Sequence, residues 1–250
     1  MHALARIAVL VLVLGSLAAS AAAAGPAPDL PVSDLFTGPG HMTKLRPGVA
    51  YQASAVPIPL RVTVPDAAWS GAQWKANLYA PDEIKRRHLT CSTSPSVCRP
   101  PYYGWAAVGQ GGVSPTSPPR VLILVMTSYS RTPSVAATVS SLRTRGHGAI
   151  YESTTPVKLA GFSGLQFDGQ IVGPKHTFIP FSPRTNKATG FADAIEEDGA
   201  GHAFRFIVLD VRGKTVVVFL GSQVMSVDEF AAFLPQADPV LASLRFPKGA

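Results

Sequence analysis

The chain has 250 residues, of which 46% are hydrophobic and 15% charged, and its formal net charge is +7 at pH 7. A chain of this length and composition can bury one substantial hydrophobic core, so we expect a single folded domain. The positive excess is mild, and aromatic residues do not interleave with the basic clusters, which argues against a nucleic-acid-binding protein.

An apolar run over residues 7–24 opens the chain, directly after Arg6, and closes on an A-x-A pattern at 22–24. This combination predicts an export signal over residues 1–24. The strongly apolar part of the run, residues 7–17, is too short for a transmembrane helix. No later stretch is long and apolar enough for one, and no cysteine follows the run to accept a lipid. We therefore expect a secreted protein, free or loosely associated with the cell envelope, without a transmembrane span, beginning at Gly25.

The first part of the mature chain is rich in proline and glycine. Residues 25–47 show no sustained apolar period and are expected to form a flexible N-terminal arm. A single α/β domain over 48–250 follows. It begins with segments 49–56 and 60–64, which are rich in β-branched or aromatic residues and are expected to pair as strands. A loop excursion is expected at 82–104.

Two cysteines, Cys91 and Cys98, lie in a Ser/Pro-rich stretch of this excursion. In an oxidising compartment outside the cell we expect them to form a disulfide that clamps a short loop. Metal binding is the alternative, because His88 lies three residues before Cys91. A closed structural zinc site would still need a fourth ligand, so we expect no metal.

Aromatic and basic side chains flank the cysteine loop. Aromatic rings beside cations suit sugars, acidic glycans or a protein partner. We therefore predict a binding surface that consists of Tyr102, Tyr103, Trp105, Lys85, Arg86 and Arg87. In the alternative interpretation, Trp105 packs in the core and the tyrosines cover the loop.

A strand-length apolar run at 121–126 is expected to be a central strand covered on both faces. A short strand at 105–108 precedes it, and the Gly/Pro-rich residues 109–119 between them are expected to be a flexible connection. A helix then begins with Thr132 as N-cap and Pro133 in its first turn. Apolar residues at i, i+4 and i+7 give this helix one buried face.

The next part of the chain predicts further strands. Segments 156–160 and 163–172 are expected to form a hairpin that turns at Gly161–Phe162. Residues 176–181 are expected to add another strand. The polar residues 182–200 are expected to be a loop.

The strongest strand pair is formed by 204–211 and 215–220, joined in a tight turn where Gly213 can take a positive φ. The whole chain then contains about eight strands and two main helices, mostly with hairpin-like connections. This order predicts an α+β fold with a largely antiparallel sheet flanked by the two helices.

A capping box marks the start of the last helix. Ser226 is its expected N-cap, with Glu229 three positions later. Pro235 is expected to kink or split this helix, because proline removes a backbone donor. Asp238 and Pro239 are expected to restart it.

Five stretches of the chain form a recognisable pattern: Pro47–Tyr51 (PGVAY), Leu60–Asp66 (LRVTVPD) with Trp69, Pro156–Asp168 (PVKLAGFSGLQFD), Val208–Gly213 (VLDVRG) and Leu241–Phe246 (LASLRF). In these stretches the chain resembles a group of secreted actinobacterial proteins. The layout of this group is similar to that of PsbP-like and mycobacterial LpqN-type domains. The resemblance implies a compact α/β sandwich that acts by binding rather than by catalysis. The matched positions are glycines, prolines and apolar residues, so they transfer a fold and no functional site.

No catalytic motif is complete. The G-x-S-x-G pattern of serine hydrolases fails at Ser163, because its second glycine comes one position early. The acidic residues around 193–198 lack the spacing of a calcium loop. We therefore predict a non-enzymatic binding module without a cofactor, whose partner is an envelope glycan, a protein or a small ligand. The alternatives are a hydrolase in which His176, His202 and the acidic residues converge, or a structural envelope protein.

Overall fold

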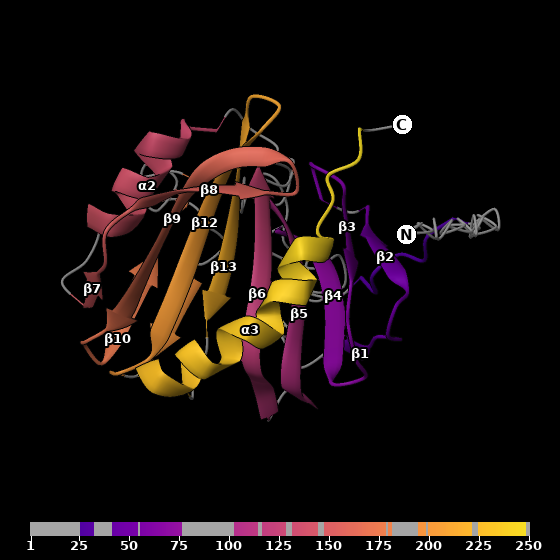
Figure 1. Cartoon of the computed structure of the whole chain (residues 1–250), viewed down its shortest axis with the longest axis horizontal. Coiled ribbons are helices and arrows are strands. Elements are labelled where there is room, and N and C mark those ends of the chain that lie inside the picture. The colour runs from indigo at the N-terminus through magenta and orange to yellow at the C-terminus, as the bar shows by residue number, and fades with distance from the viewer. Residues whose placement is uncertain are drawn as a thin grey trace, which may run out of the picture.

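The computed structural model describes residues 26–32, 42–54, 56–76, 103–114, 117–128, 132–144, 148–178, 180–181, 195–198, 200–221 and 225–248. Its centre is a nine-stranded antiparallel sheet (Figure 1). In spatial order the strands are β1 (Thr43–Lys44), β4 (Trp69–Ala76), β5 (Tyr103–Ser114), β6 (Ser117–Ser128), β13 (Lys214–Gly221), β12 (Ala203–Val211), β9 (Phe162–Ile171) and β7 (Ala149–Tyr151), and β8 (Thr155–Leu159) also pairs with β9. Two helices pack on the sheet, so the predicted α+β class is confirmed.

Two smaller sheets complete the described strands. β2 (Ala50–Ala53) pairs with β3 (Leu60–Thr63), as the sequence predicts. β10 (Lys175–Phe178) pairs with β11 (Ile195–Asp198), which lies inside the segment expected to be a polar loop. The prediction of a loop over all of 182–200 is therefore wrong, because pairing with β10 stabilises an acidic strand that has little intrinsic strand propensity.

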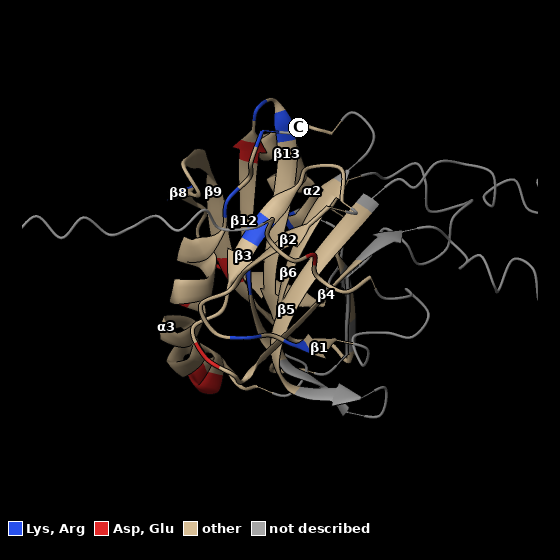
Figure 2. Ribbon diagram, turned by 90° about the vertical axis from the view of Figure 1, so that its right-hand side faces the viewer, with Lys and Arg blue, Asp and Glu red and all other residues tan. Residues whose placement is uncertain are grey.

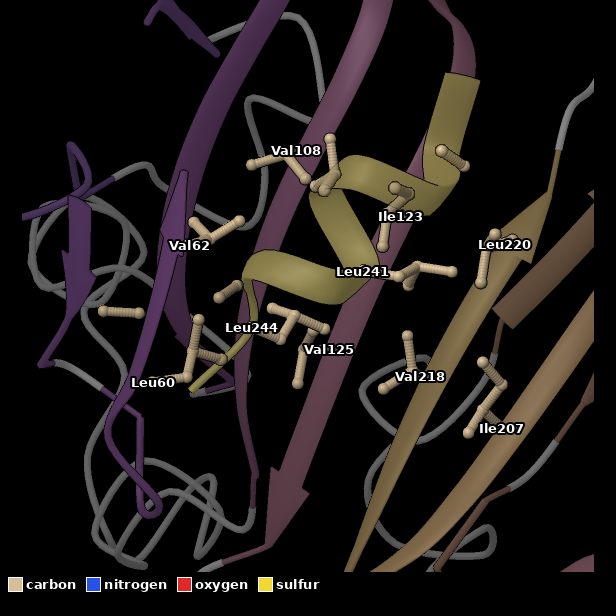
Figure 3. Packing of buried hydrophobic residues seen from close by; sticks show 14 of the residues in the cluster. Leu60, Val62, Val108, Ile123, Val125, Ile207, Val218, Leu220, Leu241 and Leu244 are labelled. Atoms are coloured by element: carbon tan, nitrogen blue, oxygen red, sulfur yellow. The ribbon is translucent and has the colours of Figure 1, made fainter. Parts of the chain in front are cut away.

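The central strands supply two hydrophobic cores, one on each face of the sheet. Along β6, Ile123 and Val125 point into the core under the last helix, α3 (Val227–Ser243), whereas Leu124 and Met126 point into the opposite core. The second core is covered by α2 (Val135–Thr144) and β10. Figure 3 shows Leu241 of α3 and the C-cap residue Leu244 among the side chains of the first core. The prediction of a central strand buried on both faces is confirmed.

The start of α2 differs from the prediction by two residues. Ser134 is the N-cap, because its carbonyl oxygen accepts the first helical hydrogen bond from Thr138 and its Oγ accepts one from the backbone N–H of Ala137 (3.2 Å). The Oγ1 of Thr132 instead accepts a hydrogen bond from the backbone N–H of Thr215 at the start of β13 (2.8 Å). The expected N-cap thus ties the helix to the sheet.

The start of α3 agrees with the prediction, but its middle is not split. Both hydrogen bonds of the capping box between Ser226 and Glu229 are present. The helix then runs without a break past Pro235 and Pro239, so the expected split is wrong. Both prolines lie on the exposed side of the helix, where water can hydrogen-bond the carbonyls that lose their backbone donors.

Two tight turns close the hairpins of the sheet. Arg212 and Gly213 both have positive φ between β12 and β13 (57° and 78°), at the predicted place. Between β8 and β9, the residues with positive φ are Ala160 and Gly161 (53° and 85°), so this turn comes one residue before the predicted one. Two successive positive φ values are typical of the type I′ turns that match the twist of paired strands.

The hairpin of β5 and β6 is much longer than the sequence predicts. The expected flexible connection at 109–119 belongs largely to these two strands. Register shifts between Gln110 and Gly111 and between Gly111 and Ser114 allow the glycine- and proline-rich residues to stay paired. The prediction of a flexible connection is therefore wrong for the described residues of this segment.

The described parts of segment 25–47 pack against the domain. Leu30, Met42 and Leu45 are buried. The backbone N–H of Leu30 donates to the carbonyl of Gln52 (2.7 Å), and the side-chain amide of Gln73 donates to the carbonyl of Leu30 (2.7 Å). These contacts attach Leu30, which lies inside the expected arm, to β2 and β4.

Candidate ligand-binding site

The predicted aromatic and basic surface is described only in part. The side chain of Trp105 is 7% exposed and belongs to the core on the α2 side of the sheet, as in the alternative interpretation. Tyr103 begins β5, where its backbone pairs with Ala76 and Ser128. Outside the described residues lie Lys85, Arg86, Arg87, Cys91, Cys98 and Tyr102. The binding surface and the disulfide remain predictions, and the ring of Trp105 is not available at the surface.

A pocket of about 220 Å³ lies between the first half of α3 and the sheet. Its floor and walls come from β5, β6, the segment before α3, and α3 itself. The lining residues are Gln110, Val121, Met225, Glu229, Ala232, Phe233 and Gln236.

Local structure explains why these residues meet. The four lining residues of α3 are at positions i, i+3, i+4 and i+7, which is one face of a helix. On the sheet, Gln110 of β5 is paired with Val121 of β6 on one side and with Trp69 of β4 on the other. Directly paired residues project from the same face, so this row lies under α3.

The pocket has an apolar floor and a polar mouth. Val121, Met225 and Phe233 are buried, whereas Glu229 and Gln236 are exposed. The Oε2 atom of Glu229 accepts hydrogen bonds from the backbone N–H and from the Oγ of Ser226 (2.9 and 3.1 Å), so this carboxylate is held in the capping box. The two glutamine amides at the pocket can each donate and accept hydrogen bonds. The lining therefore suits a ligand with an apolar body and a neutral polar group.

Trp69 packs against the pocket residue Phe233 but does not itself line the pocket. Its ring centroid is 6.1 Å from that of Phe233, and the residue is completely buried. Within the described part of the chain, its Nε1 has no hydrogen-bond partner. A buried indole N–H without an acceptor costs roughly 1–3 kcal/mol, so such groups usually call for a structural or functional explanation.

His176 forms a separate buried cluster on the other face of the sheet. Its Nε2 lies 3.2 Å from the hydroxyl of Tyr151, which donates to the carbonyl of Leu142 (3.1 Å). Its ring also packs edge-on against Phe178, with centroids 4.4 Å apart. Burial lowers the pKa of His176 and raises that of Tyr151. The imidazole is therefore held neutral inside an aromatic cluster, only 3% exposed.

The backbone brings one acidic residue close to this histidine. His176 and Glu197 are directly paired across β10 and β11. His202 precedes β12, and its carbonyl accepts a hydrogen bond from the backbone N–H of Ile171 (2.8 Å). The hydrolase alternative requires both histidines to lie beside acidic residues. Among the described residues, strand pairing places an acidic residue opposite His176 but not opposite His202.

Sequence reasoning missed the pocket because its two walls are far apart in the chain. Gln110 falls in the segment expected to be flexible, and the lining residues of the helix form no sequence motif of a ligand site. Neither a scan against models of protein families nor a search of curated proteins finds a match for the chain. Among the described residues, no helix is both long and apolar enough to cross a bilayer, and no three His, Cys, Asp or Glu residues are grouped to hold a metal ion.

Proposed function

We propose that this chain is an exported binding protein that holds a small, neutral, amphipathic molecule in the pocket under α3. The observation that carries the proposal is the pocket itself, with buried Val121 and Phe233 at its floor and the amides of Gln110 and Gln236 at its edge. Ligand sites of this kind combine an apolar lining with a few polar groups that orient the ligand.

The size of the pocket limits the ligand. Sites for drug-sized molecules have volumes of about 300–1,000 Å³. The volume here is about 220 Å³, so the ligand is smaller, or only one end of it is enclosed.

The lining favours binding over chemistry. Its one carboxylate, that of Glu229, already accepts two hydrogen bonds in the capping box. The resemblance to PsbP-like and LpqN-type domains supports the same proposal, because these domains act by binding. The mostly antiparallel sheet with two helices agrees with their layout at the level of architecture. The predicted export signal places the proposed ligand in the envelope or the medium.

Two matched variants of α3 test the proposal. Ala232 lines the pocket, whereas its exposed neighbour Ala231 does not. Ala232→Trp should fill the pocket, and Ala231→Trp adds the same side chain outside it. We expect a fragment library of neutral amides and ketones to shift NMR signals of the pocket residues in the wild type and in Ala231→Trp, but not in Ala232→Trp.

Two results of this experiment would contradict the proposal. If no fragment shifts the pocket signals, or if Ala232→Trp binds the same fragments as the wild type, the pocket is not the ligand site. Unfolding midpoints of both variants serve as the control for folding.

A further inference from the structure

Two arginines are directly opposed on one face of the molecule. Arg61 of β3 and Arg245, just after α3, form an isolated antiparallel bridge. The backbone N–H of Arg61 donates to the carbonyl of Arg245 (2.8 Å), and that of Arg245 donates back (3.0 Å). Directly opposed residues of an antiparallel pair have Cβ atoms about 4.5–5.5 Å apart, and two like charges in this position destabilise the pair.

Among the described residues, no carboxylate forms an ion pair with Arg61 or Arg245. The ion pair that the structure shows there joins Arg205 and Asp168. The Nε of Arg61 donates to the side-chain oxygen of Gln52 (3.4 Å). The Nη1 of Arg245 donates to the carbonyls of Ala242 and Leu244 (2.6 and 2.7 Å). A guanidinium group has five N–H donors, so most donors of both residues stay available.

Asp29 is the acidic residue that lies nearest to Arg61 in the strand register, and it lies one strand beyond Gln52, the pairing partner of Arg61. Asp29 forms a bridge with Gln52, and Gln52 is paired with Arg61. Neighbouring strands are about 4.8 Å apart, so Asp29 and Arg61 are separated by about 10 Å along this row. Among the described residues, the Asp29 carboxylate forms no ion pair with either arginine.

A third arginine, Arg212, contacts the residues that directly follow Arg245, which we call the C-terminal segment (246–248). Arg212, in the turn between β12 and β13, donates to the carbonyls of Phe246 (2.5 Å) and Pro247 (3.1 Å). Its guanidinium stands over the ring of Phe162 at 5.5 Å, which fixes its position. The carboxylate on this turn, that of Asp210, accepts a hydrogen bond from the backbone N–H of Gly213 (2.7 Å).

Arg61, Arg212 and Arg245 are all exposed, and we call them the arginine patch. Figure 2 views the molecule from the side of β2 and β3, with Lys and Arg segments in blue. The three side chains are anchored through neutral oxygen atoms, and none of them is ion-paired with a carboxylate of the described residues. Arginine in a fixed position suits sulfate and carboxylate groups, because its planar donors match two oxygens at once.

We propose that the arginine patch is a docking surface for an anionic polysaccharide. Binding to a bilayer surface needs an apolar anchor, and binding to single-stranded nucleic acid needs exposed aromatic rings. The exposed large hydrophobic residues of the described chain are Val32, Ile150, Val172 and Val227, and none of them belongs to the patch or to the C-terminal segment. A polymer of sugar acids or sugar sulfates needs only the cations. This proposal is independent of the pocket under α3.

Heparin is the probe for the test. Binding is measured by the fluorescence anisotropy of labelled heparin and by the salt concentration that elutes the protein from heparin resin. The variants are Arg61→Gln, Arg245→Gln and their combination. The matched control is Lys158→Gln, an exposed cation on β8 outside the patch. We expect the double variant to bind about tenfold more weakly than the wild type, with a smaller salt dependence, because two charge contacts are lost. Lys158→Gln should bind within about twofold of the wild type.

Each other outcome overturns the proposal. Equal losses in Lys158→Gln and in the single arginine variants would show attraction by overall charge. Tighter binding to phosphatidylglycerol vesicles or to single-stranded DNA than to heparin would assign the patch to another partner. A wild type that does not bind heparin at 150 mM salt excludes the surface altogether. The double variant should unfold at the same or a higher urea concentration than the wild type, since it removes a like-charge pair that destabilises the fold.

Discussion

Arg205 of β12 and Asp168 of β9 are directly opposed and join through two parallel hydrogen bonds, Nε to Oδ1 at 2.7 Å and Nη2 to Oδ2 at 2.6 Å. Their side chains are 18% and 25% exposed, so water screens this ion pair only in part. The hydrogen bond to Asp168 raises the pKa of Arg205. This pair is the opposite of Arg61 and Arg245, because here a cation in the sheet has a carboxylate directly across from it.

Replacing Asp168 by Asn should lower the free energy of unfolding by about 1–3 kcal/mol, because the half-buried guanidinium of Arg205 loses a charged acceptor. Urea unfolding at neutral pH measures the effect. Glu152→Gln is the control, since Glu152 is an exposed carboxylate that acts on Arg205 only through its charge. Its effect should stay below about 0.5 kcal/mol. Equal losses of unfolding free energy in the two variants would show that the side-chain hydrogen bonds between Arg205 and Asp168 add no stability.

Ser226→Ala should destabilise the protein by about 1 kcal/mol, because it removes the side-chain half of the capping box at the start of α3. The loss should appear in urea unfolding and as faster amide exchange in the first turn of α3. Ser153→Ala, at an exposed serine outside any helix, is the matched control. If Ser226→Ala is no more destabilising than this control, the cap does not hold the helix.

Stability should also depend on pH through His176. Burial lowers its pKa below the ordinary value of 6.5, so the unfolded chain takes up a proton at a pH where the folded protein does not. The free energy of unfolding should therefore fall as the pH decreases from about 7 towards 5. In His176→Gln this decrease should be smaller.

Tyr151→Phe separates burial from hydrogen bonding at the same place. It removes the hydroxyl that lies 3.2 Å from Nε2 of His176 but keeps the ring that buries the imidazole. The pH dependence should persist in this variant, because desolvation causes the lowered pKa. A wild type whose stability is constant from pH 7 to 5, or a His176→Gln protein with unchanged slope, would contradict the assignment.

The predicted export signal has a direct test. Expression in an actinobacterial host should place the protein in the medium or the envelope fraction, with a new N-terminus at Gly25. Intact-mass measurement should show a species two hydrogen atoms lighter than the reduced form, if Cys91 and Cys98 form the expected disulfide. Full-length protein inside the cells with both thiols reactive would contradict both predictions.

Local patterns in the sequence are sufficient for most of the sheet. The apolar run at 121–126 predicts a strand buried on both faces, because only a central strand hides two successive sides from water. Gly213 between two apolar segments predicts the hairpin of β12 and β13, and Ser226 with Glu229 predicts the start of α3. Each of these signals acts within a few residues of the chain.

Other elements have no local signal. The acidic strand β11 exists because β10 supplies its hydrogen-bond partners. The extended β5 stays paired through two register shifts, although its glycines alone indicate a flexible connection. Ser134 rather than Thr132 caps α2, because Thr132 is engaged by the distant strand β13. In each case a contact between distant segments outweighs the local preference.

The sequence by itself determined the α+β class, the central strands, two of the hairpins and the N-terminal cap of α3, because side-chain periodicity and turn chemistry are local properties. The tertiary structure alone decided which polar side chains share a surface. Gln110 and Gln236 line the same pocket, and Arg61 meets Arg245 across a backbone bridge. These neighbours come from segments far apart in the chain, and only sheet pairing and helix packing bring them together.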